Sequence, residues 1–187
     1  FVKNHGVRIH YEVEGHGSPI VLMHGFSGDL STWYESGYVE GLSKEHQLIL
    51  VDSRGHGASD KPHTPEEYDL ELMVGDLVAI LDDRGISKSS YFGYSMGGRI
   101  GFRIPLYAHN RFNSLILGGA TYPIHGDEDS KDEILSSLYY ALETARKASP
   151  ANPMVAYLTF MEKTSGQQAS PSVRKHLLPK NAVAPQA

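Results

Sequence analysis

The stretch Gly93-Tyr94-Ser95-Met96-Gly97-Gly98 decides the fold. It follows a short apolar run that ends at Phe92 and precedes a candidate helix, so Ser95 is expected on a tight turn between a strand and a helix. Such a turn requires glycine two residues to either side, because the neighbouring backbone leaves no room for a Cβ. The turn would lift the hydroxyl of Ser95 clear of the sheet, which makes Ser95 a candidate nucleophile. The alternative is a glycine-rich turn with an incidental serine.

Short apolar runs alternate with longer segments through the first two thirds of the chain, at Ile20–Met23, Leu48–Val51, Ser90–Phe92 and Leu115–Leu117. Runs of this kind between glycine-containing turns are typical of strands buried on both faces of a parallel sheet. The segment Leu70–Arg84 has apolar residues at helical spacing and is followed by Gly85, which predicts a helix. Val7–Val13 alternates and predicts antiparallel edge strands. The order predicts an α/β domain, a mainly parallel sheet with flanking helices.

Composition excludes several functions. The chain of 187 residues has 17 basic and 22 acidic side chains, a net charge of −5, so nucleic acid and anionic membranes are not expected as partners. It has no cysteine, which excludes disulfides, thiolate zinc sites and a cysteine nucleophile. No apolar run approaches the roughly 20 residues of a membrane span, and the start lacks a signal-peptide layout. We expect a soluble, cytoplasmic protein without cofactor or metal.

Two further segments supply candidates for the same site. The first apolar run ends in His24-Gly25-Phe26, and a loop there can aim the backbone N–H of Phe26 at the same point as the N–H of Met96. Two such donors would form an oxyanion hole. The segment Asp52–Asp60 follows the next strand, and we interpret it as a turn organised by the hydrogen bonds of its Asp and Arg side chains.

In this order and at these separations, three signatures strongly resemble the α/β-hydrolase superfamily: His24-Gly25, Asp52-x-Arg54-Gly55-His56-Gly57-x-Ser59 and Gly93-x-Ser95-x-Gly97-Gly98. The resemblance covers roughly residues 5–122. It implies the α/β-hydrolase fold, Ser95 as nucleophile, and Phe26 and Met96 as oxyanion donors. It also implies a small-molecule substrate, a carboxylic ester or a related acyl compound. Members that cleave epoxides or carbon–halogen bonds usually carry Asp at the elbow, so Ser95 argues against those two reactions.

The chain changes character near Tyr122. Residues 1–122 are predicted as the N-terminal part of the α/β-hydrolase core, and residues 123–187 as a helical cap segment with a weakly ordered tail. Within it, Ser130-Lys131-Asp132-Glu133 has a capping-box layout and predicts the start of a helix. No strand is predicted after Leu117, so the C-terminal strands of the superfamily fold are missing from the prediction.

The acid and base partners of Ser95 stay unassigned. Related enzymes present Ser, then Asp or Glu, then His, each after its own strand, and no histidine after Ser95 follows an apolar run. His109 is interpreted as a helix-end residue and His125 as a candidate substitute base. The order Ser95, Asp129, His176, with Asp127 also upstream, matches the triad in residue order alone. The histidines that precede Ser95, interpreted as structural or pocket-lining, are His24 and His56.

Three interpretations therefore stay open. The first is a serine hydrolase of which the chain is the first two thirds. The second is a non-catalytic or vestigial small-molecule-binding protein of the same fold. The third is a minimal hydrolase with a rebuilt triad. The reading frame beyond Ala187 would separate the first from the other two.

Two local features predict irregularities in the fold. Pro105 interrupts the helix after the elbow, because it removes an N–H and crowds the carbonyl four residues back, so we expect a kink or an early end. Leu115-Ile116-Leu117 is expected at a sheet edge without protecting Lys or Pro. Either the segment from Ser130 to Lys163 covers this edge, or two copies associate through it; we expect the homodimer.

Overall fold

The computed structural model describes residues 1–120 together with residues 147, 155 and 159. The chain divides into two compact units, one of Phe1–Pro62 with Glu67–Pro123 and one of His63–Glu66 with Ile124–Ala187. Nearly all described residues belong to the first unit. The predicted cap segment and tail over residues 123–187, apart from three isolated positions, lie outside the described residues.

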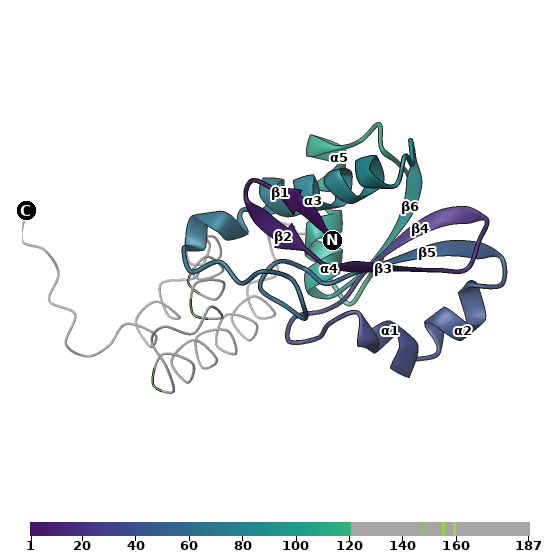
Figure 1. Ribbon diagram of the computed structural model, residues 1–187, viewed down its shortest axis with the longest axis horizontal. Coiled ribbons are helices and arrows are strands. Elements are labelled where there is room, and N and C mark those ends of the chain that lie inside the picture. Colours follow the sequence, from purple (N-terminus) through teal and green to yellow (C-terminus); the bar gives the residue numbers. More distant parts are fainter. Residues whose placement is uncertain (121–146, 148–154, 156–158, 160–187) are drawn as a thin grey trace, which may run out of the picture. The chain divides into compact units, whose positions relative to one another are not determined.

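A sheet of five strands forms the centre of the first unit (Figure 1), in the order β3 (Tyr11–Glu14), β5 (His46–Val51), β4 (Ser18–Met23), β6 (Ser89–Tyr94) and β7 (Phe112–Gly118). Only β3 runs antiparallel to its neighbour, and the other pairs are parallel. A separate antiparallel pair consists of β1 (Val2–Asn4) and β2 (Val7–Ile9). Each predicted apolar run lies within one parallel strand, so the predicted α/β fold with its mainly parallel sheet is confirmed.

The helices of the described part are short except for one. They are α1 (Ser31–Glu35), α2 (Tyr38–Leu42), the 3-10 helix η1 (Pro65–Tyr68), α3 (Leu70–Asp83), α4 (Met96–Gly101) and α5 (Ile104–Tyr107). The predicted helix is α3: the Asp69 side chain accepts the N–H of Glu71 at its start, and Gly85 follows its end with a φ of 65°. None of these helices is long and apolar enough to cross a membrane.

The segment after the elbow breaks where Pro105 predicts it. Helix α4 ends at Gly101, and α5 starts at Ile104 with the proline in its first turn. Proline is tolerated there because the first N–H groups of a helix have no intrahelical acceptor. The early end keeps α4 to six residues, and Ile100 and Ile104 remain buried.

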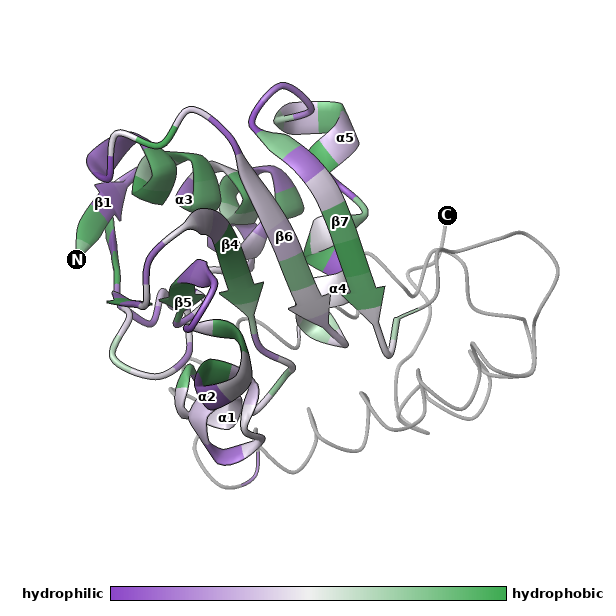
Figure 2. Cartoon of the chain, turned by 90° about the vertical axis from the view of Figure 1, so that its right-hand side faces the viewer, coloured by the Kyte–Doolittle hydropathy of each residue, from purple (hydrophilic) through white to green (hydrophobic). Residues whose placement is uncertain are grey.

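Helices cover the two faces of the sheet unequally (Figure 2). On one face, α1 and α2 pack on β4 and β5, with a core of Ile20, Leu22, Leu30, Trp33, Val39, Leu48 and Leu50. The other face, with Val21, Ile49 and Tyr91, lies against α3 and α4, because successive side chains of a strand point to opposite sides. On the α1/α2 side, the described helices reach as far as Phe92 of β6, whose ring lies 5.0 Å from that of Trp33 and 5.3 Å from that of Tyr38 between ring centroids.

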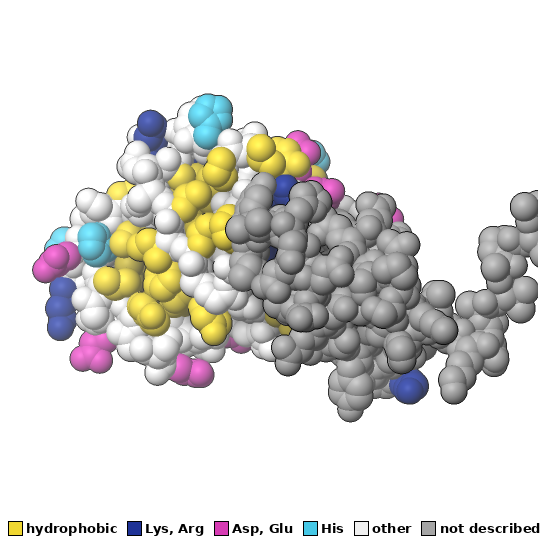
Figure 3. Space-filling view, turned by 180° about the vertical axis from the view of Figure 1, so that it is seen from behind, with side chains coloured by type: hydrophobic (Ala, Val, Ile, Leu, Met, Phe, Trp, Pro, Cys, Tyr) yellow, Lys and Arg dark blue, Asp and Glu magenta, His cyan; other side chains and the backbone are white. Residues whose placement is uncertain are grey.

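Strand β7 is the outer strand of the described sheet, since it pairs with β6 alone. Ile116 is 54% exposed and Tyr94, on the neighbouring strand, is 55% exposed. Seen from behind, hydrophobic side chains gather on this side of the molecule, with charged side chains at its margins (Figure 3). The position of Leu115–Leu117 at an edge of the described sheet is as expected, and the homodimer stays a prediction.

Candidate active site

Ser95 occupies the turn between β6 and α4 with unusual backbone angles. Its φ is 51° and its ψ is −107°, a combination that is strained for a residue with a Cβ. Its N–H donates to the carbonyl of Gly118 at 2.8 Å, and its carbonyl accepts the N–H of Arg99 at 3.0 Å. Bonds to β7 on one side and to α4 on the other therefore hold the strained residue in place.

The glycines around Ser95 are required by close backbone contacts. A Cβ on Gly93 would overlap the carbonyl of Gly97, and a Cβ on Gly97 would overlap the carbonyl of Met23 at the end of β4. These contacts place the start of α4 directly against two strand ends, which is the crowding inferred from the sequence.

The loop after β4 passes beside Ser95. A Cβ on Gly25 would lie 3.4 Å from the Cβ of Ser95, and the N–H of Gly97 donates to the carbonyl of His24 at 3.2 Å. Phe26 follows Gly25 directly and is half-buried. Met96 is the first residue of α4, where a helix gives its own N–H no acceptor. The structure thus brings the chain segments of both predicted oxyanion donors close to Ser95, the predicted nucleophile.

Two buried histidines belong to this region: His24 begins the loop, and His56 lies beside it. His24 accepts the N–H of Ser53 on Nε2 at 3.1 Å, so its hydrogen is on Nδ1, which donates to the carbonyl of Gly25 at 2.7 Å. The His56 ring lies 5.2 Å from the His24 ring, between ring centroids. Burial lowers the pKa of His24, and burial together with the nearby His24 lowers the pKa of His56 to about 4. Both rings are therefore neutral at pH 7.

The segment Asp52–Asp60 is a buried turn held by charged side chains. Arg54 is fully buried and forms two hydrogen bonds with Asp76 of α3, at 2.7 Å and 2.6 Å. It also donates to the carbonyls of Glu67 and Leu72. The interpretation of this segment as a turn organised by Asp and Arg hydrogen bonds agrees with these contacts.

No acid–histidine pair reaches Ser95 among the residues that the structure describes. His109 is exposed and follows the end of α5. The remaining candidates from the sequence, His125, His176, Asp127 and Asp129, lie outside the described residues. The part of the chain with a described structure also holds no cluster of three or more His, Cys, Asp or Glu able to bind a metal ion.

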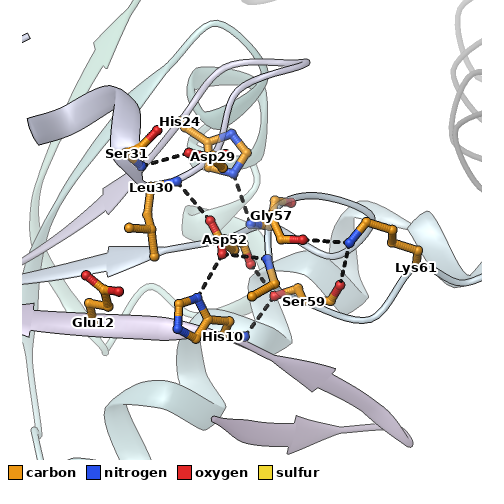
Figure 4. A network of polar contacts seen from close by, with 12 residues as sticks. His10, Glu12, His24, Asp29, Leu30, Ser31, Asp52, Gly57, Ser59 and Lys61 are labelled. Atoms are coloured by element: carbon orange, nitrogen blue, oxygen red, sulfur yellow. Dashed lines mark hydrogen bonds and ion pairs between the residues drawn. The ribbon is translucent and has the colours of Figure 1, made fainter. Parts of the chain in front are cut away.

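Sequence reasoning missed a second network, around Asp52 (Figure 4). His10, at the junction of β2 and β3, places its Nδ1 at 2.8 Å from Oδ2 of Asp52. The two residues are 42 positions apart, and no local motif marks their contact. The one available signal was that Asp52 directly follows a continuous apolar run, which predicts a buried carboxylate that needs hydrogen-bond donors.

Comparison with known proteins identifies the family. The sequence profile of the alpha/beta hydrolase fold family matches residues 18–183. Epoxide hydrolase 4 of Mus musculus is 32% identical over 124 residues, which are 65% of this chain and 34% of that protein. The dihydrolipoyllysine-residue acetyltransferase component of the acetoin cleaving system of Pseudomonas putida is 36% identical over 108 residues, 57% of this chain and 28% of that protein.

Among solved structures, the epoxide hydrolase VrEH1 of Vigna radiata superimposes with a TM-score of 0.62 at 22% identity, covering 74% of this chain and 44% of that one. This similarity supports the fold alone. The chain spans less than half the length of these relatives. Because the family profile covers most of the chain and the elbow, loop and sheet agree with it, the chain belongs to the alpha/beta hydrolase fold family.

Proposed function

We propose that the chain carries the nucleophile and the oxyanion hole of a serine hydrolase that acts on carboxylic esters or related acyl compounds. The observation that carries the proposal is the backbone of Ser95. A serine with a φ of 51°, half-buried at the end of a central strand, stores strain of about 1–3 kcal/mol. Backbone strain of this kind clusters at active sites, where it orients a side chain in a direction that an unstrained turn would not allow.

The chemistry follows from these positions. Oγ of Ser95 attacks the carbonyl carbon of the substrate and loses its proton to a base, and negative charge develops on the carbonyl oxygen. The N–H groups of Phe26 and Met96 stabilise that charge. Collapse of the intermediate releases the alcohol, which takes up the proton and leaves the acyl group on Ser95. A water molecule then attacks the acyl group by the same steps and releases the acid.

Neither buried histidine of the site is suited to be this base. Both ring nitrogens of His24 are engaged with backbone groups. A base with a pKa of about 4, as at His56, holds a proton too weakly to take one from serine at pH 7. The base is therefore assigned to neither, and the acid and base partners stay open.

An ester or acyl substrate is favoured over an epoxide by the residue at the elbow. Two of the relatives reported above bear the name epoxide hydrolase, and members with that activity usually carry Asp at this position. A serine forms an acyl ester that water hydrolyses at its carbonyl carbon, whereas opening an epoxide on serine would leave a stable ether. Ser95 therefore supports acyl chemistry.

Covalent labelling tests the proposal. A fluorophosphonate probe is expected to modify the protein at Ser95, slowly, because a serine without its base is a weak nucleophile. Ser95→Ala should abolish the label. Ser114→Ala, at an exposed serine of β7, is the control that should keep it. Peptide mapping that finds the label elsewhere, with Ser95 unmodified under forcing conditions, would overturn the proposal.

A second candidate is a non-catalytic small-molecule-binding protein of the same fold. It is supported by the absence, within the described residues, of an acid–histidine pair at Ser95. This candidate keeps the elbow, so it allows slow labelling of Ser95 but predicts no hydrolysis of short-chain aryl esters above the rate of Ser95→Ala. Ester hydrolysis measured on the parent and on Ser95→Ala therefore separates the two functions.

A further inference from the structure

The carboxylate of Asp52 joins three segments of the chain (Figure 4). Asp52 is 2% exposed. Its Oδ1 accepts the N–H of Leu30 at 2.8 Å, and its Oδ2 accepts the N–H of Ala58 at 2.8 Å and Nδ1 of His10 at 2.8 Å. Because an ionised carboxylate can only accept, the hydrogen between the two side chains belongs to Nδ1 of His10. His10 is the donor that a substitution can remove, since the other two are backbone groups.

Two of the contacts at this strand end fix the loop that passes Ser95. The loop starts at His24, whose ring accepts the N–H of Ser53 at 3.1 Å. It ends at Leu30, whose N–H donates to Asp52 at 2.8 Å. The loop is thus anchored at both ends to two consecutive residues after β5. Phe26, the predicted oxyanion donor, lies between these anchors.

The ring of His10 is itself held in place. The N–H of His10 donates to Oγ of Ser59 at 2.8 Å, and its carbonyl accepts the N–H of Asp52 at 3.0 Å. Oγ of Ser59 donates in turn to the carbonyl of Asp52 at 2.7 Å. The ring of Phe1 packs on the imidazole, with 4.7 Å between ring centroids. His10 therefore delivers a fixed N–H to one oxygen of the carboxylate.

We infer that His10 and Asp52 are positioning residues that set the loop His24–Leu30, and with it the N–H of Phe26. The inference rests on the proposed function, which gives that N–H its role. A carboxylate that loses one of its three donors reorients toward the other two, and the N–H of Leu30 then moves with it. An oxyanion donor acts only within about 2.7–3.1 Å of the developing charge, so a small shift of the loop slows the chemical step.

The first test compares labelling rates of Ser95 at saturating fluorophosphonate. His10→Ala and Asp52→Asn are expected to lower the maximal rate by about tenfold with little change in the apparent affinity for the probe. His10→Asn should restore the rate, because its amide nitrogen is as many bonds from the backbone as Nδ1. His10→Gln should not restore it.

The matched control is Arg111→Ala. Arg111 has a side chain that is 20% exposed, close to the 19% of His10, and it bonds to Asp82, Ser87 and Ile86 at the far end of β7. Its loss should leave the maximal rate unchanged. If the role of His10 were purely structural, His10→Ala and Asp52→Asn would lower the amount of folded protein but would leave the maximal labelling rate of the folded molecules unchanged. Equal maximal rates for His10→Ala and the parent would overturn the inference.

Amide hydrogen exchange gives a test that does not depend on reactivity at Ser95. In His10→Ala and Asp52→Asn, a peptide covering residues 25–31 should exchange about tenfold faster than in the parent, and in His10→Asn it should not. Unchanged exchange in His10→Ala would overturn the inference even where Ser95 is labelled. Faster exchange in a protein whose Ser95 never reacts would instead overturn the proposed function and leave the anchoring of the loop intact.

Discussion

The strand ends at β4 and β5 and the outer strand β7 differ in how completely their groups are paired. After β5, buried Asp52, Arg54 and Ser59 are all hydrogen-bonded to neighbouring segments. At β7, the described residues pair one side of the strand only, and Ile116 is 54% exposed. The first region holds charged side chains in its interior, whereas the second has no charged residue and exposes Asn113, Ser114 and Ile116.

The difference concerns how each region is held within the described residues. The turn at Ser95 and the loop His24–Leu30 are held by hydrogen bonds among described residues, to Gly118, Asp52 and Ser53. Among the described residues, the outer edge of β7 has no strand partner, and such an edge is a template for a further strand. Breaking the first region should unfold the molecule, whereas changing the second should alter its associations.

The largest effect is expected where a buried charge loses its partner. Asp76→Ala leaves the guanidinium of Arg54 buried without a carboxylate, which should lower the free energy of unfolding by about 3–5 kcal/mol. Asp82→Ala, which removes an exposed partner of Arg111, should change it by less than about 1 kcal/mol. Urea unfolding of both variants measures the difference. Similar losses in the two would show that the buried turn is no more critical than a surface pair.

The buried histidines predict a loss of stability in acid. The pKa of His56 is about 4 in the folded state, below its ordinary value near 6.5. The unfolded chain therefore takes up this proton first, and the free energy of unfolding falls as the pH drops from 6.5 to 4, by about 3 kcal/mol for this one group. His56→Gln should remove that part of the pH dependence. Unfolding curves with the same pH dependence in parent and variant would contradict the assignment.

The smallest effect on stability is expected at the outer strand. Ile116→Lys replaces an exposed residue, so the free energy of unfolding should change by less than about 0.5 kcal/mol. If two copies pair through β7, light scattering behind size exclusion should show a dimer for the parent and a monomer for this variant. A parent protein that is already a monomer at micromolar concentration would rule out the edge as an interface.

Features carried by neighbouring residues could be predicted from the sequence. The elbow at Ser95 depends on glycines within a few positions, and the strands follow from continuous apolar runs. The break after α4 follows from Pro105, because a missing N–H has the same effect in any helix interior. Strand ends were less certain: β7 begins at Phe112, three residues before the predicted run. The short helices α1 and α2 have too few turns to show a helical period.

Contacts between distant side chains could not be predicted. Asp76 lies between Met73 and Leu77 on the predicted apolar face of α3, and a lone acid there indicates a buried cation without saying which one. Likewise, His10 lies in an alternating strand segment, and a histidine is compatible with either the buried or the exposed face of a strand. The pairs Arg54–Asp76 and His10–Asp52 exist only because the sheet brings their elements together. The acid and base partners of Ser95 were not assigned from the sequence.

The backbone of Ser95 also has an evolutionary consequence. Glycine would adopt a φ of 51° with little strain, so the local conformation by itself favours Gly over Ser at this position. Only the hydroxyl argues for keeping serine. In a lineage released from the need for that hydroxyl, drift toward glycine would gain stability rather than lose it. Retention of serine at position 95 against this drift is what the proposed function requires.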